Sequence, residues 1–374
     1  MTKIGIITIH RIKNYGSVLQ AYALQQVCES LGYVTEIIDY KFPNVHHLNN
    51  KYAMAGDSLS KEPSFNRLLF AAALMRQHNG IARFVNNYQH LSSQTYNSPE
   101  ELLNAAPRYD VYITGSDQVW SPRHCNGDPS FMLHFAPAEA LKISYASSIG
   151  AKSIPEELHF LYKESLRGYR HIGVRENSAV ELIREVAGKE ATVVLDPTLL
   201  LNMNEWNKIA SSKRFMQKKY VLCYFLNYSF NAFPYADQFA EYIRKQTGYE
   251  IVYVARPPHN LKYRHTHYRV GASPEEFLAL IRDAEMILTT SFHGTAFAVN
   301  YGKPVFTIVQ DRNAGDSRQV SLMSNLGLEA HILSITDSFP SKEHFFYDVE
   351  KVQKKLDKLR GESKQFLINA LRDE

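Results

Sequence analysis

The sequence has little cysteine, no long apolar run and no leader-like start, and each absence excludes a class of protein. Its three cysteines, Cys28, Cys125 and Cys223, stand far apart among 374 residues. A disulfide framework and a closely spaced zinc cluster are therefore both disfavoured. The longest apolar run, Leu68–Met75, is too short to cross a bilayer. Met1–Ile4 leads straight into a strand pattern without the apolar core of a signal peptide, so we expect a cytoplasmic protein.

A strong excess of either charge is also missing. The net charge is +4 at pH 7 and the pI is about 8.7. The chain lacks the dense Lys/Arg blocks of nucleic-acid binders, so nucleic acid is not an expected partner. The mild basicity fits either an anionic substrate or an ordinary lysine-bearing surface. Hydrophobic residues at 45% and charged residues at 21% are a globular balance, and the length suggests two domains.

The first half of the chain has the pattern of an α/β domain. Lys3–Ile9 is a continuous apolar run, typical of a parallel strand buried on both faces. Gly16–Leu31 has apolar residues near helical spacing, and Val34–Tyr40 reads as the next strand, which completes a βαβ unit. Further strands are predicted at Tyr109–Thr114, Lys142–Ala146 and His171–Val174, helices at Phe65–Tyr88 and Glu100–Ala105, and an insertion at Pro43–Ser64.

A second series of strands and helices begins near Ala191. Its predicted strands are Thr192–Leu195, Tyr220–Leu226, Glu250–Ala255, Ala284–Leu288 and Pro304–Val309. Its predicted helices are Tyr235–Lys245, Pro274–Arg282, Gly294–Tyr301, Gln319–Leu326 and Val349–Leu371. The sequence thus predicts two Rossmann-like α/β domains, at residues 1–187 and 188–345, with a cleft between them and a terminal helix in 346–374. Ligands of such sheets bind at the carboxyl ends of the strands.

Two loops at predicted strand ends carry polar side chains suited to a sugar. Asn14–Ser17 precedes a helix, where backbone N–H groups can hold an anion or a hydroxyl, or where Asn14 merely caps the helix. Gly115–Gln118 offers a hydroxyl, a carboxylate and an amide for a polyol, or forms an Asx turn. Trp120 either stacks on a sugar face or lies in the core.

Two arginines and a histidine follow other strands. Arg175 and Arg256 have the planar fork that binds a carboxylate or a phosphate, although either can instead form a surface ion pair. His293 stands at a strand-to-helix junction with Gly294 directly behind it. The helix N-terminus there favours an anion, and a histidine beside it can donate to a phosphate or pass a proton. A structural histidine remains the alternative.

Several motifs, in this order, resemble the bacterial polysaccharide pyruvyl transferases over roughly Lys3–Leu328. They read IGIIT and NYGSVLQAYAL, GSDQVW, GVRE, LDPTLL and SFHGTAF. The resemblance implies a two-domain fold similar to GT-B glycosyltransferases, with a C-terminal helix that returns to the first domain. It also implies transfer from phosphoenolpyruvate to two hydroxyls of a sugar, which forms a cyclic pyruvate ketal and releases phosphate.

The resemblance assigns roles to residues by position. The acceptor is a sugar of a capsule or exopolysaccharide, or of its lipid-linked precursor, which would bring the protein to the inner membrane face. Neither a cofactor nor a metal is implied. By position, His293 matches the family's donor-site histidine, Arg175 a donor-binding arginine, and the two loops Asn14–Ser17 and Gly115–Gln118 the acceptor side. The predicted catalytic pair is His293 and Asp117. The full predicted donor site comprises Arg175, Ser291, Gly294, Thr295, Arg256 and Arg318. The full predicted acceptor site comprises Asn14, Tyr15, Gly16, Ser17, Gly115, Ser116, Gln118 and Trp120.

One position departs from the family pattern. Many members carry an arginine two residues before the histidine, where this chain has Ser291. Arg256, Arg312 or Arg318 would then have to supply the charge, and Arg318 is our first choice. Two alternatives stay open, namely a GT-B sugar-nucleotide glycosyltransferase and a catalytically silent homologue that binds phosphoenolpyruvate or a sugar.

Overall fold

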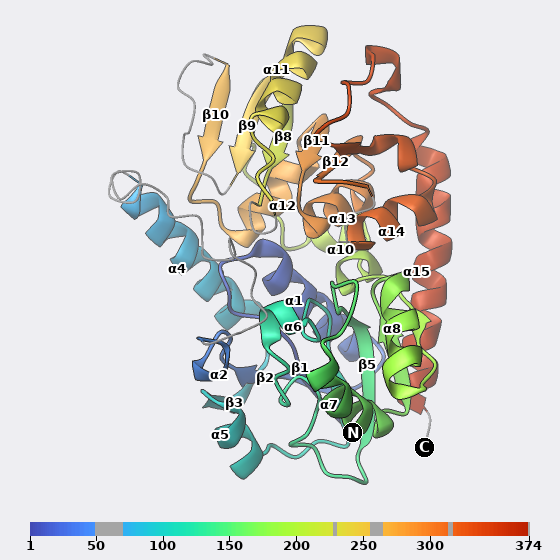
Figure 1. Cartoon of the computed structure of the whole chain (residues 1–374). Helices are drawn as coiled ribbons and strands as arrows, with labels where there is room; N and C mark the ends of the chain where they lie inside the picture. The colour runs from blue at the N-terminus through green and yellow to red at the C-terminus, as the bar shows by residue number, and fades with distance from the viewer. Residues whose placement is uncertain (49–69, 227–229, 255–264, 313–316, 373–374) are drawn as a thin grey trace.

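The computed structural model describes residues 1–48, 70–226, 230–254, 265–312 and 317–372. They form two α/β domains, stacked one above the other in Figure 1, each built on a fully parallel sheet. This confirms the predicted fold class. The predicted insertion, Pro43–Ser64, lies largely outside the described residues, and its described part contains the short helix α2 (Val45–Leu48).

The first domain contains a sheet of seven strands in the order β3-β2-β1-β4-β5-β6-β7. The strands are β1 (Lys3–Ile7), β2 (Val34–Tyr40), β3 (Leu91–Tyr96), β4 (Val111–Thr114), β5 (Leu141–Ser147), β6 (His171–Val174) and β7 (Thr192–Val193). Its helices are α1 (Tyr15–Ser30), α4 (Ala71–Tyr88), α5 (Pro99–Asn104), α6 (Pro122–Cys125), α7 (Glu156–Arg167) and α8 (Asn177–Ala187). Every residue of β4 is buried, as its apolar run predicts.

The second domain contains a sheet of six strands in the order β10-β9-β8-β11-β12-β13. The strands are β8 (Tyr220–Tyr224), β9 (Glu250–Val254), β10 (Thr266–Arg269), β11 (Met286–Thr289), β12 (Val305–Val309) and β13 (Ile332–Ser334). Its helices are α11 (Tyr235–Thr247), α12 (Pro274–Arg282), α13 (Phe292–Asn300) and α14 (Ser317–Leu326). Two short helices, α9 (Pro197–Leu200) and α10 (Met203–Asn207), lead from the first sheet to the second.

The predicted order of strands is wrong at one place. Thr192–Leu195 was expected to open the second series, but β7 pairs with β6 at the edge of the first sheet, Gly173 against Thr192 and Val174 against Val193. The first sheet therefore extends beyond residue 187, where the sequence suggests the domain boundary. The apolar run misleads because its second half, Val194 and Leu195, is buried as the chain leaves the sheet.

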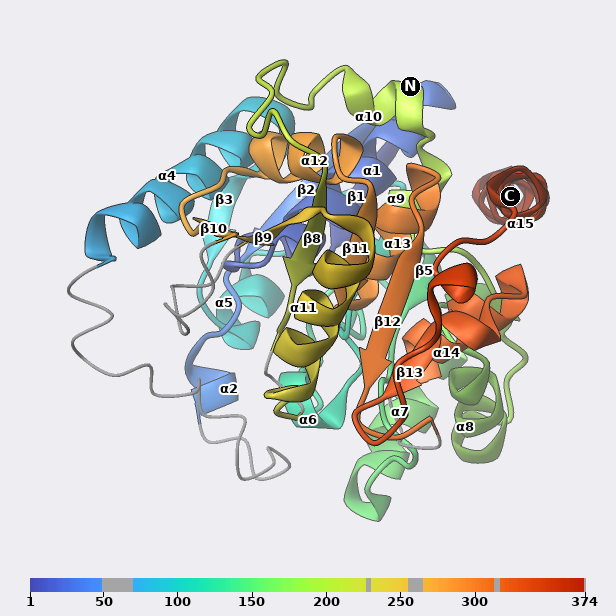
Figure 2. The same cartoon turned by 90° about the horizontal axis from the view of Figure 1, so that it is seen from above.

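The long C-terminal helix α15 (Val349–Arg372) runs along the side of both domains (Figures 1 and 2). Near its end it contacts the first domain, because the Tyr33 hydroxyl donates to the carbonyl of Leu371 at 3.4 Å. Ser363 Oγ accepts from the backbone N–H of Leu195 at 2.9 Å. The helix thus spans the joint between the two sheets.

Helix α1 joins the two domains through its first turn. The ring of Tyr15 stacks on Phe277 of α12, with centroids 4.5 Å apart. Its hydroxyl donates to the carbonyl of Ala272 at 2.8 Å and accepts from Gln77 at 2.9 Å. Tyr15 is thus part of the buried core that holds the domains together, and this contradicts its expected place in the acceptor site.

Candidate active site

The carboxyl ends of strands from both sheets face a common cavity of about 590 Å³. From the first domain come Asn14, at the start of α1, and Asp117 and Gln118, after β4. From the second come Ser291 and His293, after β11. The cavity also touches Arg123, His124, Lys152, Phe292, Gln310, Asp311, Arg318 and Gln319. The predicted cleft between the domains therefore holds the predicted catalytic pair.

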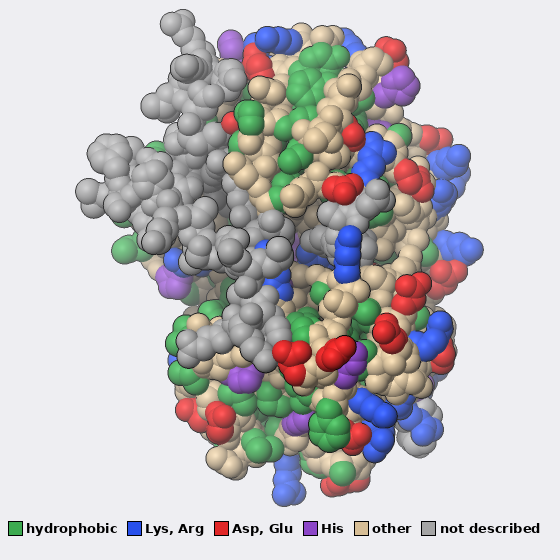
Figure 3. Space-filling view, in the orientation of Figure 1, with side chains coloured by type: hydrophobic (Ala, Val, Ile, Leu, Met, Phe, Trp, Pro, Cys, Tyr) green, Lys and Arg blue, Asp and Glu red, His purple; other side chains and the backbone are tan. Residues whose placement is uncertain are grey.

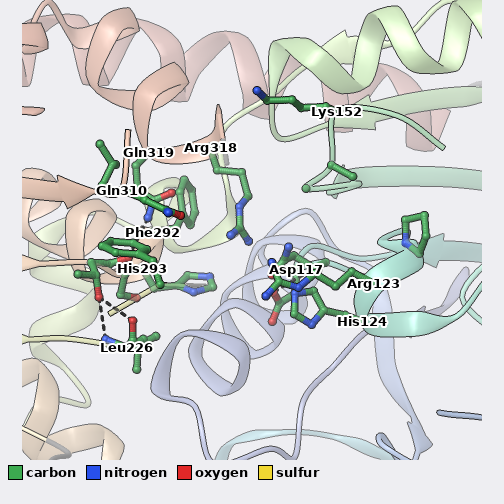
Figure 4. Close-up of a pocket in the computed structure, with 18 of the residues that line it drawn as sticks. Asp117, Arg123, His124, Lys152, Leu226, Phe292, His293, Gln310, Arg318 and Gln319 are labelled. Atoms are coloured by element: carbon green, nitrogen blue, oxygen red, sulfur yellow. Dashed lines mark hydrogen bonds between the residues drawn. The ribbon is translucent and has the colours of Figure 1, made fainter. Parts of the chain in front are cut away.

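Three basic and two acidic side chains stand among the polar residues that line this cavity. Arg123 and Lys152 come from the first domain and Arg318 from the second, with carboxylates at Asp117 and Asp311. Figure 4 shows the guanidinium of Arg318 and the imidazole of His293 projecting toward Arg123, His124 and Asp117 on the opposite wall. The three basic side chains can attract an anionic group of a ligand. The face in Figure 3, by contrast, has acidic and basic side chains interspersed over its described part.

Asp117 is held firmly at the wall of the cavity. Its backbone φ is +78°, in the left-handed region that non-glycine residues rarely adopt. Its side chain accepts from Ser17 Oγ at 2.5 Å and from the backbone N–H of Gln118 at 2.8 Å. Burial raises the pKa of Asp117, but the charges of Arg175 and His293 and these hydrogen bonds outweigh it and lower the pKa. Asp117 is therefore a carboxylate at neutral pH.

Asp196 was not among the predicted site residues, but it lies in contact with several of them. Its Oδ2 accepts from Ser116 Oγ at 2.7 Å and from Arg175 Nη1 at 3.0 Å, and lies 3.6 Å from His293 Nε2. Its Oδ1 accepts from the backbone N–H and the hydroxyl of Thr198 at 2.9 and 2.7 Å. Although burial raises the pKa of this carboxyl, the charges of His293 and Arg175 lower it well below its ordinary value.

The sequence signal for Asp196 is its place in the motif LDPTLL. In the structure it caps the N-terminus of α9. Its other partners come from loops distant in the sequence, so its role depends on the assembled fold.

Arg175 lies behind the cavity wall. Its side chain is 1% exposed, and its guanidinium sits 4.5 Å from the ring centroid of Phe292. Besides the bond to Asp196, Nη2 is 3.9 Å from Asp117 Oδ1. Nε and Nη2 have no hydrogen-bond partner among the described residues. Arg175 faces a smaller cavity of about 300 Å³, which Phe292 separates from the larger one. It is thus a buried cation with spare donors.

His293 belongs to the first turn of α13, whose N-cap is Ser291. Ser291 Oγ accepts from the backbone N–H of Gly294 at 3.3 Å, so these two residues fix the helix start. The imidazole is packed against α1, because a Cβ built on Gly16 would lie 2.0 Å from His293 Nδ1. Its Nε2 has no hydrogen-bond partner among the described residues.

The structure brings some predicted binding residues to the cavity and leaves others outside it. Asn14, Gln118, Ser291 and Arg318 line the cavity. Trp120 is fully buried, and its indole N–H donates to the carbonyl of Phe131 at 3.1 Å, which contradicts stacking on a sugar. The hydroxyl of the fully buried Thr295 meets that of Thr307 at 2.7 Å.

Several predicted residues that the structure describes do not line the cavity. The N–H of Gly115 donates to the carbonyl of Ile7 at 2.9 Å, within the first sheet. Ser116 and Ser17 hold the carboxylates of Asp196 and Asp117. Arg256 lies outside the described residues. Of the two described cations suggested to replace the family arginine, Arg318 lines the cavity, whereas Arg312 pairs with Asp337 at 2.9 Å.

Comparison with known proteins decides the family. The model of the polysaccharide pyruvyl transferase family matches residues 14–312. The chain belongs to this family. The match contains all of the residues around the cavity named above except Arg318 and Gln319. No curated protein matches the sequence.

Solved structures similar to this pyruvyl transferase family member include epimerases of the GT-B fold. The UDP-GlcNAc 2-epimerase of Neisseria meningitidis, bound to UDP-GlcNAc, has a TM-score of 0.54 at 9% identity, covering 100% of both chains. That of Methanocaldococcus jannaschii scores 0.51 at 13% identity, covering 99% of each chain. A putative one from Listeria monocytogenes scores 0.52 at 11% identity, covering 98% of this chain and 90% of that one. At such identities the likeness shows the fold alone.

No described helix combines the length and apolar character needed to span a membrane. Within the same residues, no three His, Cys, Asp or Glu side chains form a group that could hold a metal ion.

Proposed function

We propose that this member of the family transfers a pyruvyl group from phosphoenolpyruvate to two hydroxyls of a sugar, forming a pyruvate ketal. The acceptor is a cell-surface polysaccharide or its lipid-linked precursor. Phosphoenolpyruvate is the donor substrate, and the proposal assigns no resident cofactor. In this proposal the protein works in the cytoplasm, and at the inner membrane face where the acceptor is lipid-linked.

The observation that carries the proposal is that His293 and Asp117, from different domains, line the same cavity. His293 Nε2 is buried without a hydrogen-bond partner among the described residues, and Asp117 is ionised and fixed by Ser17. The chemistry needs a proton donor and a proton acceptor at opposite sides of one reacting carbon. It also needs positive charge for a substrate that bears a phosphate and a carboxylate, which Arg123, Lys152 and Arg318 supply.

In the proposed reaction, protonated His293 gives its Nε2 proton to the methylene carbon of phosphoenolpyruvate. The double bond becomes a methyl group, and positive charge develops at the carbon that bears the phosphate. A sugar hydroxyl attacks this carbon, and Asp117 accepts its proton. The carbon–oxygen bond to phosphate then breaks, and the second hydroxyl attacks the same carbon to close the ketal. Of the two hydroxyl protons, one replaces the proton given by His293 and the other leaves with phosphate.

Arg318 is the cation that we propose in place of the family arginine missing at Ser291. It lines the cavity from α14, on the same wall as His293. A guanidinium there can bind the phosphate bidentately and stabilise the charge that develops as phosphate leaves. Arg175, behind Phe292, supports the same charge through its spare donors. Asn14 and Gln118 line the first-domain wall, where the acceptor is proposed to bind.

The proposal is tested by following phosphoenolpyruvate and free phosphate by ³¹P NMR, with a panel of sugar and lipid-linked acceptors. We expect phosphate release that requires both substrates, and a ketal methyl signal in the product. His293→Ala should lower turnover by about 100-fold or more, which is the usual contribution of a proton donor.

The matched control is His331→Ala, which removes another buried histidine of the same domain. His331 stacks on Phe306 and its Nδ1 contacts the carbonyl of Val305 at 3.1 Å, away from the cavity. It should retain turnover at temperatures where it is folded. Turnover of a nucleotide sugar without any use of phosphoenolpyruvate would replace the proposal by a glycosyltransferase function. Binding of phosphoenolpyruvate without turnover would make the protein a silent homologue.

A further inference from the structure

We infer that Glu176, which lines neither of the two cavities, is a positioning residue for the cavity wall of the first domain. It holds the loop that follows β5, residues 148–153, and this β5 loop in turn holds Asp117 and Gln118. The inference rests on the proposed function, in which Asp117 accepts the proton of the sugar hydroxyl and Gln118 lies on the acceptor side. It gives a role to the last residue of the motif GVRE.

The carboxyl group of Glu176 makes its hydrogen bonds with the β5 loop. The residue is fully buried, and Oε1 accepts from Ser148 Oγ at 3.1 Å. The same oxygen accepts from the backbone N–H groups of Ile149 and Gly150 at 2.9 and 3.0 Å. Glu176 stands at the N-cap position of α8, but its side chain makes no cap hydrogen bond there. Its contacts therefore fix the loop rather than its own helix.

Ser148 connects the β5 loop to the loop that carries Asp117. Its backbone N–H donates to the carbonyl of Asp117 at 3.0 Å, and its own carbonyl accepts from the N–H of Trp120 at 3.2 Å. Ser148 is thus bonded to residues on both sides of Gln118. Because buried backbone groups need their partners, a shift of Ser148 would displace Asp117 or break these bonds.

Gly150 connects the β5 loop to the side chain of Gln118. Its φ is +57°, in the left-handed region that favours glycine. A Cβ on Gly150 would lie 2.3 Å from Gln118 Nε2, so the amide packs directly against the backbone there. Both residues line the larger cavity. The position of the amide in the cavity therefore depends on the loop that Glu176 holds.

The basic groups of the cavity depend less on Glu176. Lys152 belongs to the β5 loop, but it is exposed, and its long flexible side chain can reach the same point from a slightly shifted backbone. Arg318 and His293 come from the second domain. We therefore expect the loss of Glu176 to weaken the binding of the acceptor more than that of phosphoenolpyruvate.

The test replaces Glu176 by alanine in the full chain, which leaves three donors of the β5 loop without their acceptor. Hydrogen–deuterium exchange, read by mass spectrometry, should become at least about tenfold faster in peptides that contain residues 148–150 and 117–120.

Kinetics give the second readout, with the acceptor from the panel that supports most phosphate release. KM for that acceptor should rise at least about fivefold in Glu176→Ala. The Kd of phosphoenolpyruvate, measured by isothermal titration calorimetry, should stay close to its wild-type value. A mere loss of folded protein would lower the apparent kcat and leave KM unchanged, so KM separates positioning from stability.

Two further variants keep the test decisive. Glu176→Gln retains an oxygen that can accept from the β5 loop, so its KM should lie between those of wild type and Glu176→Ala. It decides the question if Glu176→Ala does not fold, with a KM at least about twofold above wild type expected. Glu250→Ala is the matched control, because Glu250 is also buried but lies at the start of β9, whereas the cavity lies at the carboxyl ends of the strands. It should lower the melting temperature without changing KM or the exchange of residues 117–120.

A wild-type KM for the acceptor in folded Glu176→Ala overturns the inference, as does faster exchange that is confined to residues 148–150. A wild-type KM in Glu176→Gln does so where the alanine variant does not fold. The proposed function fails separately, when the wild-type protein uses no phosphoenolpyruvate with any acceptor. Exchange needs no turnover, so faster exchange of residues 117–120 in either variant would then leave the positioning of Asp117 and Gln118 by Glu176 standing, and unchanged exchange would overturn it.

Discussion

At the scale of single residues, the site depends on a glycine, Gly16, as much as on the residues that carry functional side chains. Gly16 does not have a positive φ, so its backbone conformation does not require glycine and an alanine is compatible with helix α1. What the glycine permits is contact with His293, because a Cβ would lie within 2.1 Å of Nδ1 and Cγ. Gly16 was expected in the acceptor site. In the structure the imidazole of His293 packs against it instead.

Gly16→Ala should therefore separate activity from stability. The added methyl group must displace the imidazole of His293, so we expect kcat to fall by at least about tenfold, which is typical of a misplaced catalytic group. Gly361→Ala is the control, because Gly361 is also helical and a Cβ there meets nothing within 4 Å. It should gain roughly 0.5–1 kcal/mol of stability and keep full turnover. Equal kcat values in the two variants would show that the ring of His293 is not held by α1.

At the scale of elements, helices α13, α9 and α15 are joined by one buried set of hydrogen bonds. Asn300, at the end of α13, donates to the carbonyls of Thr198 and Leu201, both at 2.8 Å. Arg360 of α15 donates to the carbonyl of Leu199 at 2.6 Å and to Asn300 Oδ1 at 3.1 Å. Because α13 carries His293 and α9 carries Asp196, this set fixes the two groups relative to each other.

Arg360→Met should weaken that joint. The variant leaves the Leu199 carbonyl and Asn300 Oδ1 without a donor, and each buried unpaired group costs about 1–3 kcal/mol. We expect urea unfolding to show a loss of about 2 kcal/mol or more. The control Arg184→Met breaks an exposed pair with Glu190 and should cost less than about 1 kcal/mol. A loss no larger than that of the control would mean that α15 does not fix the joint.

The same scale shows which parts of the fold the sequence predicts. Buried central strands such as β1 and β4 are continuous apolar runs, and these were found. Strands β3 (LSSQTY) and β10 (THYR) were missed, because an edge strand carries exposed or half-exposed polar residues. Asp117 and His293 were predicted as site residues because they follow strands, and both line the cavity. Asp196 was missed, because its importance comes from Ser116 and Arg175, which approach it only in the folded chain.

At the scale of the whole molecule, the cavity lies between the two domains, and each domain contributes its own basic residues to the cavity wall. Arg123 and Lys152 belong to the first wall and Arg318 to the second. A ligand that bears both a phosphate and a carboxylate can engage both walls at once. Binding of such a ligand would then stabilise each domain and also hold the two domains in their positions relative to each other. The ordinary surface charge of the protein, by contrast, gives no reason to expect general anion binding.

Phosphoenolpyruvate should therefore raise the melting temperature of the wild-type protein, because a ligand of the folded state stabilises it by mass action, by roughly 2.7 kcal/mol at a hundredfold excess over Kd. Arg318→Gln should remove most of this stabilisation if Arg318 supplies the charge that Ser291 lacks. Arg312→Gln is the matched control, since Arg312 is half exposed and pairs with Asp337. Differential scanning fluorimetry with phosphoenolpyruvate and, for comparison, UDP-GlcNAc measures both variants. Equal stabilisation of wild type and Arg318→Gln by phosphoenolpyruvate would show that another cation, such as Arg123 or Lys152, holds the phosphate.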